Sequence, residues 1–204
     1  MTIKVVHDFI CPWCWVGLFQ AQRLQKEFGV EIEWIGGELF PEELAWPEPA
    51  IRVPDPPNRP ATKSRFEFLK YIEGIEVPKV TRPPRMRSHN AHLAVEFAKM
   101  VGKADQVVEA LYRAYYESGQ PIGELETAVA ITGPIVGDEE GLRRAIDAEQ
   151  GAETFIHFDD PAYAEGIYNV PTFFIGDERL AEQPYGEIRA AMERLLSSEH
   201  RESA

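Results

Sequence analysis

Hydrophobic and polar positions near the N-terminus predict a strand, a helix and a second strand. Apolar residues at positions 3, 5, 6 and 9 fit a buried strand. Apolar residues at 18, 21, 24 and 28 then follow one helix face, and Gly29 is a typical helix end. Clean alternation over residues 30–35 predicts the second strand. The chain therefore opens as an α/β sheet protein.

A proline-rich stretch interrupts this pattern. Prolines at 41, 47, 49, 54, 56, 57 and 60 exclude a regular helix or a central strand. The segment is therefore an ordered surface loop or a stiff linker. Interspersed apolar residues favour a packed loop; these are Phe40, Leu44, Trp46, Ile51 and Val53.

Helical spacing dominates residues 62–165. Apolar sets recur around residues 93–101, 107–115, 125–131 and 142–146, and Gly102, Gly119 and Gly133 are expected near helix ends. Strand character returns at residues 170–176, followed by a turn, a short partner strand at 179–181 and a last amphipathic helix over 188–195. This order predicts one α/β domain from residues 1–40 and 166–204. An inserted helical domain, residues 41–165, has the proline-rich loop at its entry.

Composition and charge narrow the function classes. The 204 residues carry a formal net charge of −13, which argues against a nucleic-acid or anionic-membrane partner because both need a basic surface. No apolar stretch reaches the roughly 18 residues of a membrane span, and the N-terminus does not resemble a signal peptide. We therefore expect a cytoplasmic protein.

The two cysteines, Cys11 and Cys14, lie where the first strand passes into the first helix. In a reducing compartment such a pair favours redox chemistry or metal binding over a permanent disulfide. Free N–H groups and the dipole at a helix N-terminus favour the thiolate form of Cys11. Cys14, one turn further on, is expected to be more buried and to resolve a mixed disulfide formed at Cys11. Pro12 and Trp13 set the environment of the pair.

A zinc site is the alternative for the same cysteines. A C-x-x-C pair often supplies half of the ligands, and two more are then required. The remaining candidates are His7, His89, His92 and His157. A pair between a strand and a helix, with proline second, is atypical of a zinc knuckle, and we therefore predict no metal.

Asp8 and Pro171 each have two interpretations, one catalytic and one structural. Asp8 can accept the proton of the resolving thiol if it is buried, or it can be a solvated acid at the strand end. His7 is expected on the exposed side of the strand. Pro171 can be an ordinary proline at a strand start, or a cis proline packed beside the cysteines that leaves the Val170 backbone free to pair with a ligand.

In these motifs the sequence resembles the DsbA-like branch of the thioredoxin superfamily. Residues 8–14 (DFICPWC), the helical insertion and residues 169–174 (NVPTFF) occur in the family's order. The subgroup it resembles is the FrnE-type disulfide oxidoreductases, which are akin to 2-hydroxychromene-2-carboxylate isomerases and kappa-class glutathione transferases. The resemblance implies a thioredoxin-like fold with a large all-helical insertion.

The resemblance also implies roles for particular residues. Cys11 and Cys14 are then the redox pair and Pro171 is the cis proline beside them. Residues 88–92 open a helix of the insertion on the active-site side. The implied substrate-binding residues are Val170, Thr172, Ser88, His89 and His92.

Two departures favour dithiol chemistry over glutathione-dependent isomerisation. The isomerase and transferase relatives usually hold serine where this chain has Cys11, and residues 181–185 match their glutathione-binding loop poorly. Arg87 also replaces the asparagine that often precedes Ser88 in the family.

Three functions remain open at this point. The first is a thiol–disulfide oxidoreductase without a tightly bound cofactor, acting on protein or small-molecule thiols as a monomer or homodimer. The second is a glutathione-dependent isomerase or transferase. The third is a non-catalytic zinc-binding or partner-binding module.

Overall fold

A computed structural model describes residues 1–46 and 63–202 of the chain. The prolines at positions 47–60, and the expected packing of Ile51 and Val53, lie outside the described residues. Of the part that is described, Phe40 and Trp46 stack with ring centroids 4.8 Å apart, as a packed loop requires. Leu44 is 47% exposed, so its predicted packing is wrong.

A four-stranded mixed sheet forms the centre of the molecule. Its strands are β1 (Thr2–His7), β2 (Glu31–Gly36), β3 (Thr172–Ile175) and β4 (Glu178–Ala181), in the order β2-β1-β3-β4. β1 pairs parallel to β2, with Val5 opposite Trp34, and antiparallel to β3, with Val5 opposite Phe173. Two segments far apart in sequence therefore meet at β1, the strand that leads to the cysteines.

Helix α1 (Pro12–Phe28) joins β1 to β2, as the spacing predicts. Pro12 occupies its first position, where a missing N–H costs nothing. Gly29 ends it in the left-handed conformation (φ 68°), and its N–H donates to the Gln25 carbonyl.

All the helices between β2 and β3 lie in the predicted block. They are α2 (Arg65–Glu73), α3 (His89–Met100), α4 (Ala104–Ser118), α5 (Leu125–Val136), α6 (Glu139–Asp147), the 3-10 turn η1 (Ala152–Thr154) and α7 (Asp160–Ala164); α8 (Tyr185–Glu202) follows β4. Gly119 ends α4 and Gly102 directly follows the C-cap of α3.

The expected helix end at Gly133 is wrong. Gly133 is buried inside α5, and Gly137 ends that helix in the left-handed conformation. A Cβ at Gly133 would lie 3.3 Å from the Cβ of Glu139. The glycine therefore serves the close approach of α6 to α5, which a pattern of local helix signals does not reveal.

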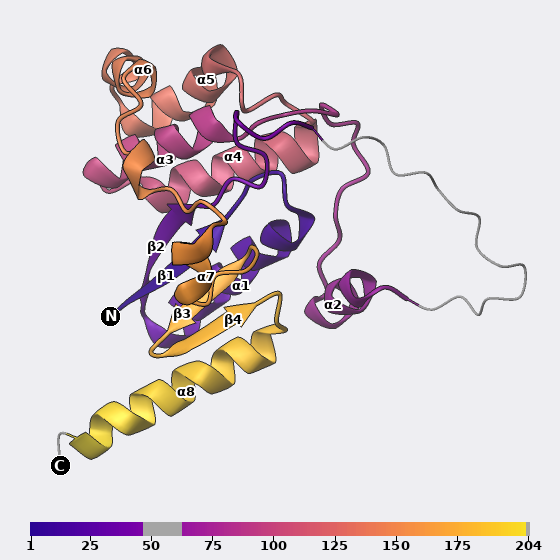
Figure 1. The fold of residues 1–204 in the computed structure, drawn as a ribbon, viewed down its shortest axis with the longest axis vertical. Coiled ribbons are helices and arrows are strands. Elements are labelled where there is room, and N and C mark those ends of the chain that lie inside the picture. The colour runs from indigo at the N-terminus through magenta and orange to yellow at the C-terminus, as the bar shows by residue number, and fades with distance from the viewer. Residues whose placement is uncertain (47–62, 203–204) are drawn as a thin grey trace, which may run out of the picture.

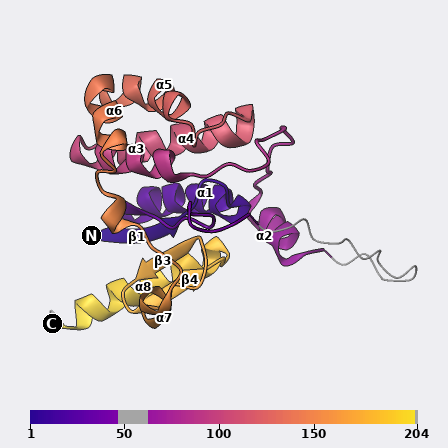
Figure 2. The same ribbon diagram turned by 45° about the horizontal axis from the view of Figure 1, so that its top comes forward.

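The helices form layers around the sheet (Figure 1). Helices α3–α6 gather beyond β1 and β2, whereas α8 runs along β3 and β4. The turned view in Figure 2 places α1 and β1 between these two groups. In both views α2 lies apart from the α3–α6 group, next to α1.

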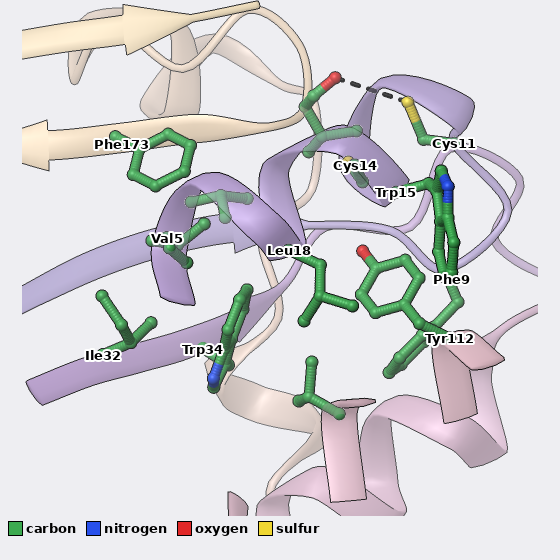
Figure 3. Close-up of a cluster of buried hydrophobic side chains, with 14 of the residues drawn as sticks. Val5, Phe9, Cys11, Cys14, Trp15, Leu18, Ile32, Trp34, Tyr112 and Phe173 are labelled. Carbon is green, nitrogen blue, oxygen red and sulfur yellow. Dashed lines mark hydrogen bonds between the residues drawn. The ribbon is translucent and has the colours of Figure 1, made fainter. Parts of the chain in front are cut away.

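One hydrophobic core joins the sheet to α1, α4 and α8. Figure 3 shows the part of this core that lies between the strands, α1 and α4. Trp34, Phe173 and Tyr112 are among its largest fully buried side chains. Tyr115 and Tyr116 are also buried, and Trp15 stacks on Tyr116 with ring centroids 4.9 Å apart. A second cluster fills the space between α3, α5 and α6.

The backbone at Gly123 packs closely against the backbone just before α3, and a substitution at Gly123 can test this contact. A Cβ at this residue would lie 1.8 Å from the carbonyl oxygen of Arg87. Gly123→Ala must therefore push backbone away from backbone, and we expect it to lower the free energy of unfolding by about 2 kcal/mol or more. Denaturant unfolding followed by circular dichroism measures this loss.

Gly186→Ala is the matched control, because a Cβ at Gly186 meets nothing within 4 Å. It should change the free energy of unfolding by no more than about 1 kcal/mol, in the stabilising direction. Equal effects of the two substitutions would contradict this account of the packing.

Candidate active site

Cys11 sits at the N-cap of α1, where the helix presents N–H groups that have no partner within the helix. A tight turn from Asp8 brings it there, with the Cys11 N–H donating to the Asp8 carbonyl over 3.2 Å. Cys14 follows one turn later, and its N–H donates to the Cys11 carbonyl over 3.0 Å. Both thiols are free. Cys14 is 1% exposed and Cys11 6%, so the second cysteine is the more buried, as expected.

The segment before β3 approaches Cys11 from the other side. The Val170–Pro171 peptide bond is cis. The Cys11 thiol donates to the Val170 carbonyl oxygen over 3.5 Å (Figure 3). That carbonyl, expected to be free for a ligand, is therefore engaged by the thiol in this structure. Thr172 is fully buried, and its hydroxyl donates to the Asn169 carbonyl over 2.6 Å.

Gly17 in α1 permits this approach. A Cβ on Gly17 would lie 3.1 Å from both Cβ and Cγ of Pro171. The Pro171 ring thus packs directly on the helix that carries both cysteines. The two sequence motifs, far apart along the chain, meet at one place.

Cys14 is held in a fully buried environment. The Asp8 backbone N–H donates to its sulfur over 3.5 Å. Burial raises the pKa of the Cys14 thiol well above its ordinary value, and a hydrogen bond with the Cys11 side chain raises it further. The resolving thiol therefore needs help to lose its proton.

The Asp8 side chain is fully buried beneath the cysteine turn, so the alternative of a solvated acid is wrong. One carboxylate oxygen, Oδ1, accepts from the Ser88 hydroxyl over 2.6 Å and from the Ile10 N–H over 3.2 Å. The other, Oδ2, accepts from the Leu39 N–H over 2.8 Å. His92 Nε2 lies 3.7 Å from Oδ1. The carboxylate thus joins β1, the loop after β2 and the start of α3.

His7 is 1% exposed, so the expectation of an exposed position is wrong. Strand β1 is covered on both faces. The Nδ1 atom of His7 forms a 2.9 Å hydrogen bond with the Tyr112 hydroxyl. Burial lowers the pKa of His7 well below its ordinary value, and the nearby His92 and Lys99 lower it further. The Tyr112 hydroxyl also lies 3.3 Å from the Asp8 carbonyl oxygen.

The predicted residues of α3 divide into two groups. Ser88 and His92 reach Asp8, whereas His89 turns to Glu38, with 2.5 Å between Nδ1 and Oε1. This hydrogen bond to Glu38 raises the pKa of His89. Arg87 donates to the Phe40, Pro41 and Leu44 carbonyls and so ties the loop after β2 to α3.

Trp13 borders the site together with residues that the sequence analysis missed. Its ring centroid lies 4.9 Å from that of Phe66 on α2, and the Arg65 guanidinium lies 5.4 Å above the Trp13 ring. Phe68 and Tyr71 of the same helix are 56% and 72% exposed. The short apolar run of residues 66–72 predicts a helix, but no local signal in the sequence places this helix beside the cysteines.

Among the described residues, no group of three or more histidine, cysteine, aspartate or glutamate side chains is placed to hold a metal ion. The zinc alternative therefore finds no ligand set in this part of the chain. None of the helices described has the length and apolar content to cross a membrane.

Comparison with known proteins places this geometry among related folds. The chain is 25% identical over 200 residues to the uncharacterized protein YwbO of Bacillus subtilis (strain 168), covering 98% of this chain and 97% of that protein. It is 21% identical over 184 residues to the 2-hydroxychromene-2-carboxylate isomerase of Pseudomonas sp. (strain C18), covering 87% and 83%.

A solved structure shows the same fold. The cytosolic disulfide reductase DsbM from Pseudomonas aeruginosa, solved with GSH, superimposes with a TM-score of 0.64 at 17% identity, over 98% of this chain and all of that one. The proteins that this chain resembles thus include a disulfide reductase and an isomerase. The family model for the DSBA-like thioredoxin domain matches residues 2–192. The chain therefore belongs to the DSBA-like thioredoxin family.

Proposed function

We propose that this protein is a thiol–disulfide oxidoreductase that uses Cys11 and Cys14 as its redox pair. One observation carries the proposal: Cys11 sits at the N-terminus of α1, against the Val170 carbonyl, with Cys14 buried one turn behind it. Free N–H groups at a helix N-terminus stabilise a thiolate, the species that attacks disulfides.

The reaction has two exchange steps. The Cys11 thiolate attacks one sulfur of a substrate disulfide, forming a mixed disulfide and releasing the other half as a thiolate that takes up a proton. Cys14 then loses its proton and attacks the Cys11 sulfur. The bond to the substrate breaks, the second thiol leaves, and a Cys11–Cys14 disulfide remains. An external dithiol reduces this disulfide again, and the reverse sequence oxidises a substrate dithiol.

Asp8 is suited to accept the Cys14 proton. It is buried below the cysteine turn, its backbone N–H contacts the Cys14 sulfur, and its carboxylate oxygens are held in place by hydrogen bonds from the Ser88 hydroxyl and the Leu39 N–H. Proton transfer to a positioned carboxylate lowers the barrier for a thiol whose pKa is raised by burial.

The substrate side of the site includes the wall formed by Trp13, Phe66 and Arg65, together with the Val170 backbone and His89. Thr172, Ser88 and His92, which were expected to bind substrate, are buried and support the site from within. We assign residues 1–40 and 166–204 to the thioredoxin-like unit and residues 41–165 to its helical insertion. In this proposal the protein acts in the cytoplasm, and the similar structure of DsbM is named as that of a cytosolic protein. The proposed working form is a monomer or a homodimer.

A glutathione-dependent isomerase is the second candidate. It is supported by the likeness to 2-hydroxychromene-2-carboxylate isomerase and by the GSH in the DsbM structure. Cysteine instead of serine at position 11 favours the redox function.

Replacing each cysteine tests the first function. Cys11→Ser removes the attacking sulfur, so we expect insulin reduction in the presence of dithiothreitol to fall to the rate of dithiothreitol alone. Cys14→Ser keeps the first step and removes the second, so a mixed disulfide at Cys11 should accumulate and be visible by mass spectrometry. Wild-type activity in the Cys11→Ser variant would refute the mechanism.

The raised pKa of Cys14 predicts the pH dependence of the second step. Below that pKa the thiolate fraction grows about tenfold per pH unit. In an Asp8→Asn variant, where no carboxylate accepts the proton, the decay of a mixed disulfide preformed at Cys11 should therefore accelerate steadily from neutral to alkaline pH, as quenched-flow sampling can measure. The Cys14→Ser variant is the control and should show no decay. A rate independent of pH in this range would contradict the assignment of Cys14.

Glutathione binding separates the two candidates. An isomerase needs saturable binding of reduced glutathione that survives Cys14→Ser, together with turnover of 2-hydroxychromene-2-carboxylate. We expect no such turnover by the wild type, measured by absorbance. Turnover that is unchanged in Cys14→Ser would favour the isomerase function instead.

A further inference from the structure

The charge on Asp8 needs compensation that the cysteine motif does not supply. Asp8 is completely buried, and two N–H groups and one hydroxyl donate to its carboxylate oxygens. Such donors favour the ionised form, but an isolated buried charge still costs several kcal/mol. A positive group close by would offset this cost.

His92 is the group in position to carry that positive charge. Its Nε2 lies 3.7 Å from Asp8 Oδ1, and its side chain is 1% exposed. Within the described residues, His92 is the one group that pairs with Asp8 at ion-pair distance, and its Nε2 has no hydrogen-bond partner there. This nitrogen is therefore free to direct an N–H toward the carboxylate.

The surrounding packing fixes the His92 ring. A Cβ on Gly36 would lie 3.0 Å from Cγ and Nδ1 of His92, so the glycine leaves room for the ring. Phe9 and Phe155 contact the ring, with centroid distances of 4.9 and 5.6 Å. Ser88, one turn earlier, donates to the same Asp8 oxygen. One end of α3 thus delivers both a hydroxyl and an imidazole to the carboxylate.

The other titratable groups around the pair do not compete for this role. His7 on β1 lies 5.1 Å from the His92 ring, but burial and the proximity of His92 lower its pKa, and it bonds Tyr112 of α4. Glu38, in the loop after β2, is paired with His89. Cys14 on α1 has a raised pKa and stays neutral until it reacts. Lys99, further along α3, is paired with Glu96.

We propose that His92 is a positioning residue whose positive charge holds Asp8 ionised beside Cys14, so that Asp8 can take the Cys14 proton. This inference rests on the proposed function. In the second exchange step the Cys14 proton passes to the Asp8 carboxylate and the thiolate attacks Cys11. The released substrate thiolate takes up a proton, and His92 keeps its own proton throughout. The helical insertion thereby takes part in the chemistry of the thioredoxin-like unit.

A double-mutant cycle tests the proposal through the pH profile of mixed-disulfide decay. His92→Gln keeps a polar side chain but removes the charge, so Asp8 and Cys14 together should hold their proton to higher pH. We expect the rising part of the profile to shift to higher pH by about one unit, which is about a tenfold slower decay at any pH on that part of the profile. In an Asp8→Asn background, His92→Gln should add nothing further.

The control is His157→Gln, because His157 is exposed and does not contact Asp8; its profile should match the wild type. A merely structural role of His92 predicts a different result, namely the same loss in both backgrounds with no shift of the profile. That result would overturn the proposal.

Nitrogen-15 NMR of histidine-labelled wild-type protein gives a readout that requires neither turnover nor a substituted His92. At neutral pH the Nε2 of His92 should show the shift of an imidazolium, and Asp8→Asn should convert it to neutral imidazole. Neutral imidazole in the wild type would overturn the proposal. If the wild type failed to reduce insulin while the NMR result held, the proposed function would fail and the Asp8–His92 pair would stand.

Discussion

The structure around the cysteines depends on the burial of one carboxylate. Asp8 lies under the turn that starts α1 and accepts hydrogen bonds from the Ile10 and Leu39 N–H groups and the Ser88 hydroxyl. These donors come from three separate segments. Each must be in place, because an unsatisfied buried carboxylate would cost several kcal/mol. The same contacts that hold the cysteine turn therefore also tie the loop after β2 and the start of α3 to it.

This constraint explains why the insertion is more than a cover for the sheet. Arg87 bonds the backbone of the loop that follows β2, and Gly123 lets the segment after α4 pack on the Arg87 carbonyl. Both contacts fix the residue directly before Ser88. On the opposite side, Gly17 admits the Pro171 ring against α1. Cys11 is thus placed between two rigid contacts, one from the insertion and one from the segment that enters β3.

Much of this arrangement could be predicted from sequence, because the signals involved are local. Alternation predicts β1 and β2, and Gly29 predicts the end of α1. The meeting of Cys11 with the segment at Pro171 is not local, and it was expected from the resemblance of the two motifs to the family. The failures concern residues whose environment is set by distant segments. His7 alternates as an exposed residue but is covered by Tyr112, and Gly133 looks like a helix end but accommodates α6. Phe66 and Arg65 contact Trp13 because of where α2 lies relative to α1. Local secondary-structure propensities do not determine that placement.

In proteins that share a fold, a few side chains at the site decide which reaction is catalysed. Proteins with this fold include disulfide oxidoreductases and an isomerase, so the scaffold alone does not select the reaction. A thiolate at position 11 can attack a substrate disulfide and form a mixed disulfide, and a second sulfur one turn on can then attack Cys11 and release the substrate as a thiol. The second sulfur is useful only if it can lose its proton, and burial opposes that loss by raising its pKa. In the mechanism that we propose, a buried acid with its own counter-charge resolves this conflict without exposing Cys14 to solvent. The pair of Asp8 and His92 then serves dithiol exchange, whereas a reaction that uses only the first position would have no use for it.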